Sequence, residues 1–135
     1  MEKTLNTIFG QEYLDIDGRI CIWDKNALPF VIKRVFVISD VQHAQVRANH
    51  ANMKNEEAII CVQGGVRVEA QVGKRIMDVK LTPTGVALDV PSGAWIKLSS
   101  FDPYTILVVL CSEPYDPDDY IYDYVEWKKL NKERT

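Results

Sequence analysis

His50 is the side chain in this sequence best suited to moving a proton. It lies in the segment Arg47-Ala48-Asn49-His50-Ala51-Asn52, which ends four residues before a pair of glutamates. An imidazole titrates near neutral pH, so it can accept a proton in one step and return it in the next. The alternative is a structural histidine whose ring nitrogens are satisfied by neighbouring groups. We favour the first interpretation and predict that His50 is the acid or base of a site.

Arg34 and Arg47 are candidates for binding phosphate. A guanidinium group presents a planar fork of donors that matches phosphate oxygens, and two such groups could neutralise a diphosphate. In an extended strand, Arg34 shares its face with Ile32 and Phe36, which favours an inward orientation. An ordinary surface salt bridge is the alternative, and for Arg34 alone it is nearly as well supported.

The composition restricts the class of protein. The chain has 135 residues, of which 47% are hydrophobic and 26% charged, and its formal net charge is -3. We therefore expect residues 1–135 to form a single globular domain with a substantial core. Nucleic-acid binding requires a concentrated basic face, which this sequence does not contain. The longest apolar run is far shorter than a membrane span, so we expect no membrane association.

The cysteines and the first residues point to a reducing compartment. Cys21, Cys61 and Cys111 are an odd number without a Cys-x-x-Cys spacing, and the last two follow apolar runs. They are interpreted as small buried residues of strands. The first six residues contain no apolar core of a secretion signal. A cytoplasmic location is therefore expected.

Short apolar runs separated by glycine and proline predict an antiparallel β-sandwich or barrel. Residues 31–40 carry aliphatic side chains on both faces, which is typical of an interior strand of a sandwich. Gln63-Gly64-Gly65 separates two apolar runs and predicts a hairpin turn. The expected strands are residues 19–23, 31–40, 58–62, 66–72, 75–81, 86–90, 95–98 and 104–111.

The last twenty residues have a different pattern. Asp116 followed by Pro117 is typical of a helix start, with an N-cap and a proline in the first turn. Apolar residues then recur at helical spacing, with lysines toward the end. We expect a short C-terminal helix lying on the sandwich, with Tyr120, Tyr124, Trp127 and Leu130 on one face.

Two motifs resemble those of cupin barrels. The first cupin motif reads His-x-His, three or four residues, Glu, six residues, Gly. Here His50, Glu57 and Gly64 hold those places, and Asn52 stands at the second His. In the second motif, Gly85 and Pro91-Ser92-Gly93 match, but Ile96 stands at the His position. The resemblance implies an all-β, cupin-type antiparallel jelly roll (a double-stranded β-barrel), carrying the short C-terminal helix.

Further segments are similar to the cupin family of sugar-nucleotide 3,4-ketoisomerases. Leu28-Pro29-Phe30-Val31-Ile32-Lys33-Arg34-Val35 resembles that family's Pro-Phe-x-Ile-Lys-Arg-Val-Tyr. The tail from Tyr115-Asp116 to Asp119-Tyr120-Ile121 resembles its Tyr-Asp-x-x-Asp-Tyr-Ile. The family's enzymes act on thymidine-diphosphate-4-keto-6-deoxyglucose and move the keto group from C4 to C3. The chain departs from the family at Asn52, Ile96, Phe36 and Asp17, where the family has His, His, Tyr and Arg.

The resemblance implies a sugar-nucleotide isomerase or epimerase that serves unusual deoxysugar and polysaccharide biosynthesis. His50 would be the acid or base, and Asn49 and Asn52 would orient hydroxyl or carbonyl oxygens. Trp95 would stack on a base or sugar, although such a residue is more often barrel core. Lys97 would contact phosphate or sugar, unless it points to solvent opposite Ile96. The alternative function is a non-catalytic sugar-nucleotide-binding cupin that has lost the reaction.

Glu56 and Glu57 lie on opposite faces of one strand, so at most one faces the barrel interior. The cupin spacing selects Glu57, whereas the closer family alignment selects Glu56, and the sequence leaves both open. Either would have only His50 beside it as a good ligand, and a stable metal site normally has three or more. We therefore expect no required metal and no cofactor. We also expect a homodimer, because the family pairs through its sheets and residues 5–14 are apolar enough to join a neighbour's sheet.

Overall fold

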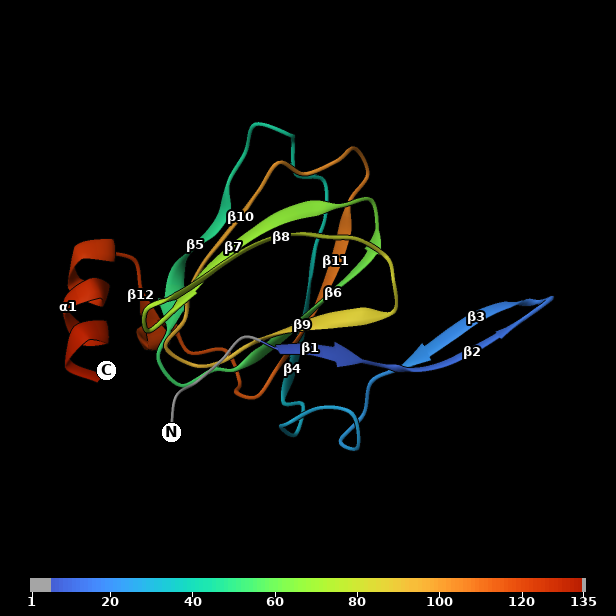
Figure 1. Cartoon of the computed structure of the whole chain (residues 1–135), viewed down its shortest axis with the longest axis horizontal. Helices are drawn as coiled ribbons and strands as arrows, with labels where there is room; N and C mark the ends of the chain where they lie inside the picture. The colour runs from blue at the N-terminus through green and yellow to red at the C-terminus, as the bar shows by residue number, and fades with distance from the viewer. Residues whose placement is uncertain (1–5, 135) are drawn as a thin grey trace.

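The computed structural model describes residues 6–134 and consists mainly of antiparallel strands, with one helix at the C-terminal end (Figure 1). The first five residues, which contributed to the arguments on secretion and strand exchange, lie outside this range. The elements are β1 (Asn6–Phe9), β2 (Gln11–Asp15), β3 (Gly18–Ile22), β4 (Arg34–Ile38), β5 (Arg47–Asn52), β6 (Glu57–Gln63), β7 (Val66–Val72), β8 (Arg75–Leu81), β9 (Val86–Val90), β10 (Trp95–Ser99), β11 (Ile106–Cys111), a 3-10 turn (Pro117–Asp119), β12 (Tyr120–Ile121) and α1 (Tyr124–Arg134).

Two five-stranded sheets face each other, which confirms the predicted cupin-type jelly roll. One sheet has the order β1-β9-β6-β11-β4, and the other has the order β12-β5-β10-β7-β8. Their strand pairs are antiparallel. The hairpin of β2 and β3 forms a separate two-stranded ribbon that projects away from the body (Figure 1). We call these the β6 sheet, the β5 sheet and the projecting hairpin.

The core lies between the two sheets because alternate residues of each strand point inward. In β6, Ile59 and Cys61 belong to this core, whereas Ala58 and Ile60 pack in a second cluster on the outer face. That outer cluster is covered in part by the segment that contains Leu28 and Phe30. A strand buried on both faces has no polar alternation, which is why β6 reads as a continuous apolar run.

The predicted hairpin at Gln63-Gly64-Gly65 is wrong. The strands on either side belong to different sheets, since β6 pairs with β9 and β11 whereas β7 pairs with β8 and β10. Gly64 has a φ of 79° and sits against the backbone of Thr105, where a Cβ atom would clash. The Gly65 amide donates a hydrogen bond to the Thr105 hydroxyl at 3.0 Å. The two glycines therefore take the chain around a corner between the sheets.

The strand expected at residues 31–40 is shorter and lies at an edge. Only Arg34–Ile38 form β4, and this strand pairs with β11 alone. Its outward residues, Val35 and Val37, are 54% and 59% exposed. Aliphatic residues occupy both faces of β4, but the outer ones remain uncovered in the single chain. Such apolar surface is typical of an interaction face.

The C-terminal helix is confirmed, but it begins later than the sequence suggests. Asp116 caps only the 3-10 turn at Pro117–Asp119. The chain then adds β12 to the β5 sheet before α1 begins at Tyr124. The Asp123 side chain caps this helix, since it accepts hydrogen bonds from the backbone amides of Val125 and Glu126. Tyr120 therefore belongs to a strand and not to the helix. Within residues 6–134, no helix is long and apolar enough to cross a membrane.

Candidate active site

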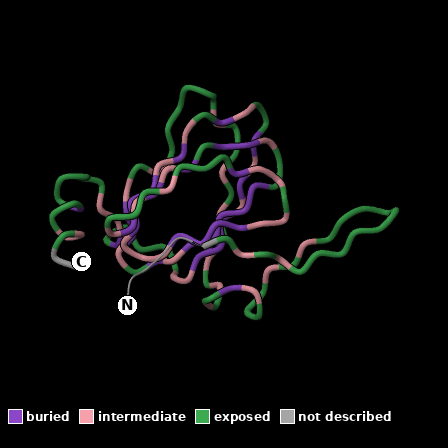
Figure 2. Tube along the Cα trace, viewed as in Figure 1, coloured by how far each residue is buried: buried purple, intermediate pink, exposed green. Residues whose placement is uncertain are grey.

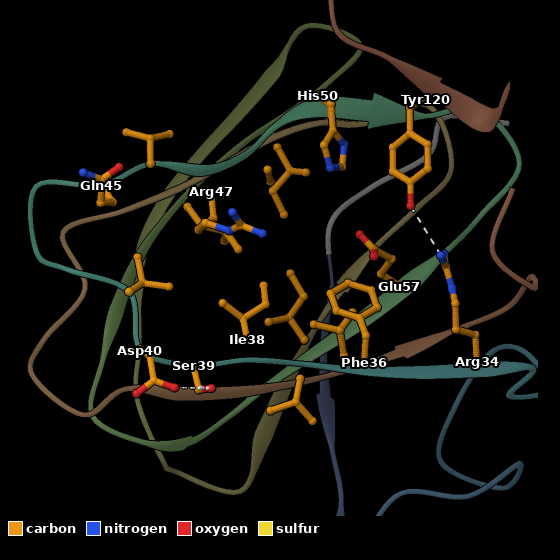
Figure 3. A pocket seen from close by; sticks show the side chains of 18 of the residues that line it. Arg34, Phe36, Ile38, Ser39, Asp40, Gln45, Arg47, His50, Glu57 and Tyr120 are labelled. Atoms are coloured by element: carbon orange, nitrogen blue, oxygen red, sulfur yellow. Dashed lines mark hydrogen bonds between the residues drawn. The ribbon is translucent and has the colours of Figure 1, made fainter. Parts of the chain in front are cut away.

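A cavity of about 930 Å³ opens between the two sheets. Its volume lies within the range of small-molecule sites in proteins. Figure 3 shows that side chains of β5 and β4 enter it from opposite walls. The polar or aromatic lining residues are Arg34, Phe36, Ser39, Asp40, Gln42, Gln45, Arg47, His50, Glu57, Tyr115 and Tyr120. The apolar lining residues include Ile38, Ile59, Ile96, Leu98 and Val109.

His50 points into this cavity from the β5 sheet, as predicted (Figure 3). Its ring contacts Tyr120 edge to face, with the ring centroids 5.0 Å apart. Burial lowers the pKa of His50 below its usual value, so the imidazole is neutral at pH 7. The buried Nδ1 atom has no hydrogen-bond partner among the described residues. A neutral imidazole has one unprotonated ring nitrogen, so a His50 side chain that lines the cavity is able to accept a proton from a ligand.

A β-bulge positions His50 on the strand. Ile96 of β10 pairs with His50, but Lys97 pairs with Ala48, so that Asn49 is the extra residue. Ala48 and Asn49 both have a φ of 62°. Asparagine tolerates this left-handed conformation better than most residues do. Because of this extra residue, Arg47 lines the cavity together with His50 although it lies three positions earlier in the strand.

Arg34 enters the cavity from β4. Its Nη1 atom donates a hydrogen bond to the Tyr120 hydroxyl at 3.3 Å, and its guanidinium lies over the rings of Phe36 and Tyr115 at 5.6 and 5.8 Å. The buried Nε atom has no partner in the described part of the chain. These contacts fix the guanidinium at the cavity wall.

Arg47 also lines the cavity, but it lies on the opposite side from Arg34 (Figure 3). The two arginines come from different sheets, β5 and β4. Both predicted phosphate-binding residues are therefore in the site, although they do not form one adjacent pair.

Glu57 resolves the ambiguity between the two glutamates. Glu57 lines the cavity and is 7% exposed, whereas Glu56 lies on the other face of the strand, next to Asp89. Burial raises the pKa of Glu57 to about 7, and the positive charge of Arg34 only partly opposes this rise. The cupin spacing thus selected the correct residue.

The structure does not place Asn49 or Asn52 in the cavity. Asn49 is exposed in the bulge. Asn52 is buried, and its side-chain amide donates to Asp119 at 3.3 Å. The Asp119 carboxylate also accepts hydrogen bonds from the backbone amides of Lys54 and Asn55. Asn52 therefore helps to hold the 3-10 turn against the end of β5, which the strand pattern alone could not indicate.

Trp95 and Lys97 also lie outside the cavity. They share one face of β10, and the residues between and after them, Ile96 and Leu98, line the cavity on the other face. Trp95 is buried beneath α1, with its ring centroid 5.7 Å from that of Trp127. Trp95 therefore packs in the interface with the helix. Lys97 points away from the cavity, on the opposite face of β10 from Ile96.

Sequence reasoning missed Tyr115 and Tyr120 as site residues. Tyr120 contacts His50 and accepts the hydrogen bond from Arg34. Both tyrosines lie in the tail segment whose similarity to the family was noted, and that similarity was the available signal. The spacing of Tyr120 and Tyr124 predicted a helix instead, because a strand of only two residues has no recognisable pattern in the local sequence.

Two of the motif positions that coordinate a metal in other cupins do not offer a metal-coordinating side chain to the cavity of this protein. Ile96 has no donor atom, and the Asn52 side chain is bonded to Asp119. Within residues 6–134, no three His, Cys, Asp or Glu side chains group closely enough to hold a metal ion. The donor set therefore does not fit a transition metal.

Comparison with known proteins gives a consistent result. Residues 5–132 match the family described as FdtA: WxcM-like, C-terminal. The TDP-4-oxo-6-deoxy-alpha-D-glucose-3,4-oxoisomerase of Aneurinibacillus thermoaerophilus is 34% identical over 117 residues, which cover 84% of each chain.

Solved structures are similar over almost the whole chain. A His-to-Asn mutant of the 3,4-ketoisomerase QdtA from Thermoanaerobacterium thermosaccharolyticum, in complex with TDP-4-keto-6-deoxyglucose, has a TM-score of 0.92 and 28% identity. The match covers 99% of this chain and 98% of that one. WlaRA, a TDP-fucose-3,4-ketoisomerase of Campylobacter jejuni, has a TM-score of 0.89 and 26% identity, with 96% of each chain covered.

Proposed function

The chain belongs to the WxcM-like, C-terminal (FdtA) family, and from this membership we propose that it is a sugar-nucleotide isomerase. Its substrate is a thymidine-diphosphate-linked 4-keto-6-deoxy sugar, and the reaction moves the keto group between C4 and C3. The observation that carries the proposal is the neutral His50 at the wall of a cavity in a chain 34% identical to a 3,4-oxoisomerase.

The reaction needs a base that is close to both carbons. His50 removes the proton from C3, which produces an enediol, and returns a proton to C4, so that the keto group ends at C3. The lowered pKa of His50 favours this role, because the imidazole starts in the form that accepts a proton. The edge-to-face contact with Tyr120 holds the ring against the cavity wall.

The two arginines have separate tasks. Arg47 binds the diphosphate on its side of the cavity, because a guanidinium matches phosphate oxygens. Arg34 donates to an oxygen of the sugar, since its hydrogen bond to Tyr120 holds the guanidinium at the cavity wall. This division follows from the two arginines lying on opposite sides of the cavity (Figure 3).

A sugar-nucleotide-binding protein without activity is the rival function. It is favoured by Asn52 and Ile96, which stand where the resembling family has histidines. The two functions separate when the protein is incubated with TDP-4-keto-6-deoxyglucose in D2O and followed by NMR, in parallel with a thermal-shift panel of nucleotide sugars. The isomerase forms a 3-keto product. Binding of panel ligands with neither product nor deuterium incorporation would establish the rival.

We expect the purified protein to work without a metal or another cofactor. Ile96 and the engaged Asn52 leave too few ligands in the cavity for a transition metal. Elemental analysis should find far less than one zinc, iron or nickel per chain, and EDTA treatment should leave turnover unchanged. One metal per chain whose removal abolishes activity would contradict this prediction.

We also expect a cytoplasmic homodimer in which residues 1–135 act as one cupin domain. Residues 6–9 of the segment expected to join a neighbour already pair with β9 of their own chain, and Leu5 lies outside the described residues. The projecting hairpin is the better contact element, since it is exposed along its length (Figure 2). Its apolar side chains include Leu14, Ile16 and Ile20, which are 73%, 100% and 62% exposed.

Light scattering at micromolar concentration should therefore give twice the mass of the chain. Ile20→Glu should shift the protein toward the monomer, because it introduces a charge into the buried contact. Ile76→Glu is the matched control, since Ile76 is 75% exposed on β8, away from the hairpin. A monomeric wild type, or equal effects of the two variants, would contradict the hairpin contact.

A further inference from the structure

The cavity contains a buried carboxyl group that the single-histidine mechanism leaves unused. Glu57 lies on β6, the central strand of its sheet, and points into the cavity from the wall opposite β5, which carries His50 (Figure 3). It is 7% exposed. Burying a carboxylate is costly unless it is paired or strongly hydrogen-bonded. Its position at the wall of a ligand-sized cavity therefore requires an explanation.

The immediate surroundings of Glu57 do not stabilise a full negative charge. Among the described residues, no Lys, Arg or His forms an ion pair with it. The hydrogen bond recorded to its carboxyl group comes from the Cys111 thiol at 3.8 Å, which is a weak donor. Apolar residues flank it in the cavity wall, including Ile59 and Val109.

Asp119 provides an internal comparison. It is 6% exposed, so it is buried as deeply as Glu57. Its carboxylate, however, accepts hydrogen bonds from the Asn52 side chain and from the amides of Lys54 and Asn55. The hydrogen bonds of Asp119 give it a structural role, whereas Glu57 lacks comparable donors.

The proposed reaction needs a second proton carrier. Moving a keto group from C4 to C3 transfers one proton between carbons and another between oxygens. His50 is the imidazole that lines the cavity, because Asn52 is bonded to Asp119 and position 96 is an isoleucine. An acid that serves the oxygens must therefore come from another residue.

We propose that Glu57 is this second proton carrier, an inference that rests on the proposed isomerase function. As His50 takes the proton from C3, Glu57 donates its proton to the C4 carbonyl oxygen, and a neutral enediol forms. His50 then returns its proton to C4, and the Glu57 carboxylate takes the proton from the C3 hydroxyl. The C3–H and C3 O–H bonds break, the C4–H and C4 O–H bonds form, and both side chains regain their initial states.

Several charged or titratable groups surround Glu57 and set its proton affinity. Burial raises the pKa of Glu57 to about 7, with Asp119 adding to the rise and Arg34 and the Cys111 thiol opposing it. A group at this value can both donate and recover a proton near neutral pH. Arg34 on β4, Cys111 on β11 and Asp119 in the 3-10 turn act on it directly. The other titratable groups of the cavity are His50 and Arg47 on β5, Tyr120 on β12, Tyr115 before the 3-10 turn and Asp40 after β4.

The test is Glu57→Gln, which keeps the shape and hydrogen bonding of the side chain but cannot release a proton. Glu56→Gln is the matched control, because it makes the same change one residue away on the opposite face. We expect turnover of TDP-4-keto-6-deoxyglucose to fall ~10²-fold in Glu57→Gln, at the lower end of the range for general acid–base catalysis. Affinity for TDP should be unchanged in both variants, and Glu56→Gln should retain wild-type turnover.

The pH profile distinguishes proton transfer from a structural role. Wild-type kcat should rise as His50 loses its proton and fall as Glu57 loses its own, and Glu57→Gln should lack the fall on the basic side. Stability gives a readout without substrate. A carboxyl group whose pKa is higher in the folded state binds its proton more tightly when the protein is folded. The contribution of Glu57 to the free energy of unfolding is therefore fully present below about pH 4.3 and is lost as the pH rises through about 7. The stability of Glu57→Gln relative to wild type should therefore increase over this interval.

The possible results assign failure to the correct hypothesis. A wild type that binds TDP but converts no keto sugar overturns the isomerase function, and Glu57 as proton carrier with it. An active wild type whose Glu57→Gln variant keeps full turnover or the basic limb overturns the role of Glu57 alone. Loss of TDP affinity in Glu57→Gln, or an equal loss of turnover in Glu56→Gln, also overturns it, because either result indicates a structural effect.

Discussion

His50→Gln is expected to lower turnover of the 4-keto sugar nucleotide by ~10²–10⁴-fold and to leave the affinity for TDP nearly unchanged. Glutamine retains some hydrogen bonding, but it cannot accept and return a proton. Only the step that transfers the proton should therefore suffer. The measurement is single-turnover formation of the 3-keto isomer by NMR, combined with a TDP titration. A variant that retains more than a tenth of wild-type turnover would contradict the role of His50.

Arg47→Ala provides the opposite pattern. The diphosphate is present in the ground state and in the transition state alike. Removing the contact between Arg47 and the diphosphate should therefore weaken substrate binding more than it lowers kcat.

The wild-type value of kcat/KM should rise with pH as His50 loses its proton, because the base must be neutral. The midpoint of this rise should lie below the usual pKa of histidine, and His50→Gln should remove the rise.

Trp127→Ala is expected to destabilise the protein by about 3–5 kcal/mol. Trp127 is 2% exposed and packs its ring against those of Trp95 and Tyr124, with centroids 5.7 and 5.5 Å apart. Its Nε1 atom also donates to the backbone carbonyl of Gly93 at 2.8 Å. Alanine would leave a cavity and an unsatisfied carbonyl at the base of α1.

The measurement is chemical denaturation at a fixed protein concentration, since association changes apparent stability. Val125→Ala is the control in the same helix. Val125 is 64% exposed, and its truncation should change the free energy of unfolding by less than about 0.5 kcal/mol. A loss below 1 kcal/mol in Trp127→Ala would show that the helix does not depend on this contact.

The strands and the central site residue were accessible from sequence because their signals are local. Apolar runs separated by glycine and proline indicated β6, β7 and β11 to within a residue or two. The spacing of His50, Glu57 and Gly64 predicted an inward-facing histidine, and the structure selected Glu57 over Glu56, which the sequence had left open. Spacing along a strand predicts which side chains face inward, because successive side chains point to opposite faces.

Three expectations failed where the outcome depended on partners remote in sequence. Gly64 and Gly65 resemble a hairpin turn, but the pairing of β6 with β11 directs the chain to the other sheet. Asn52 has the strand parity of His50, yet Asp119, which lies 67 residues away, binds its amide. Trp95 is a plausible stacking residue until α1 covers it.

The residue types of the site were therefore determined by the sequence, and their chemical states by the tertiary structure. An imidazole at position 50 and a carboxyl at position 56 or 57 follow from the chain alone. Their burial on facing walls of one cavity lowers the pKa of the first and raises that of the second, because desolvation disfavours the charged form of each. Neither shift is encoded in neighbouring residues, since both arise from sheets that the fold brings face to face.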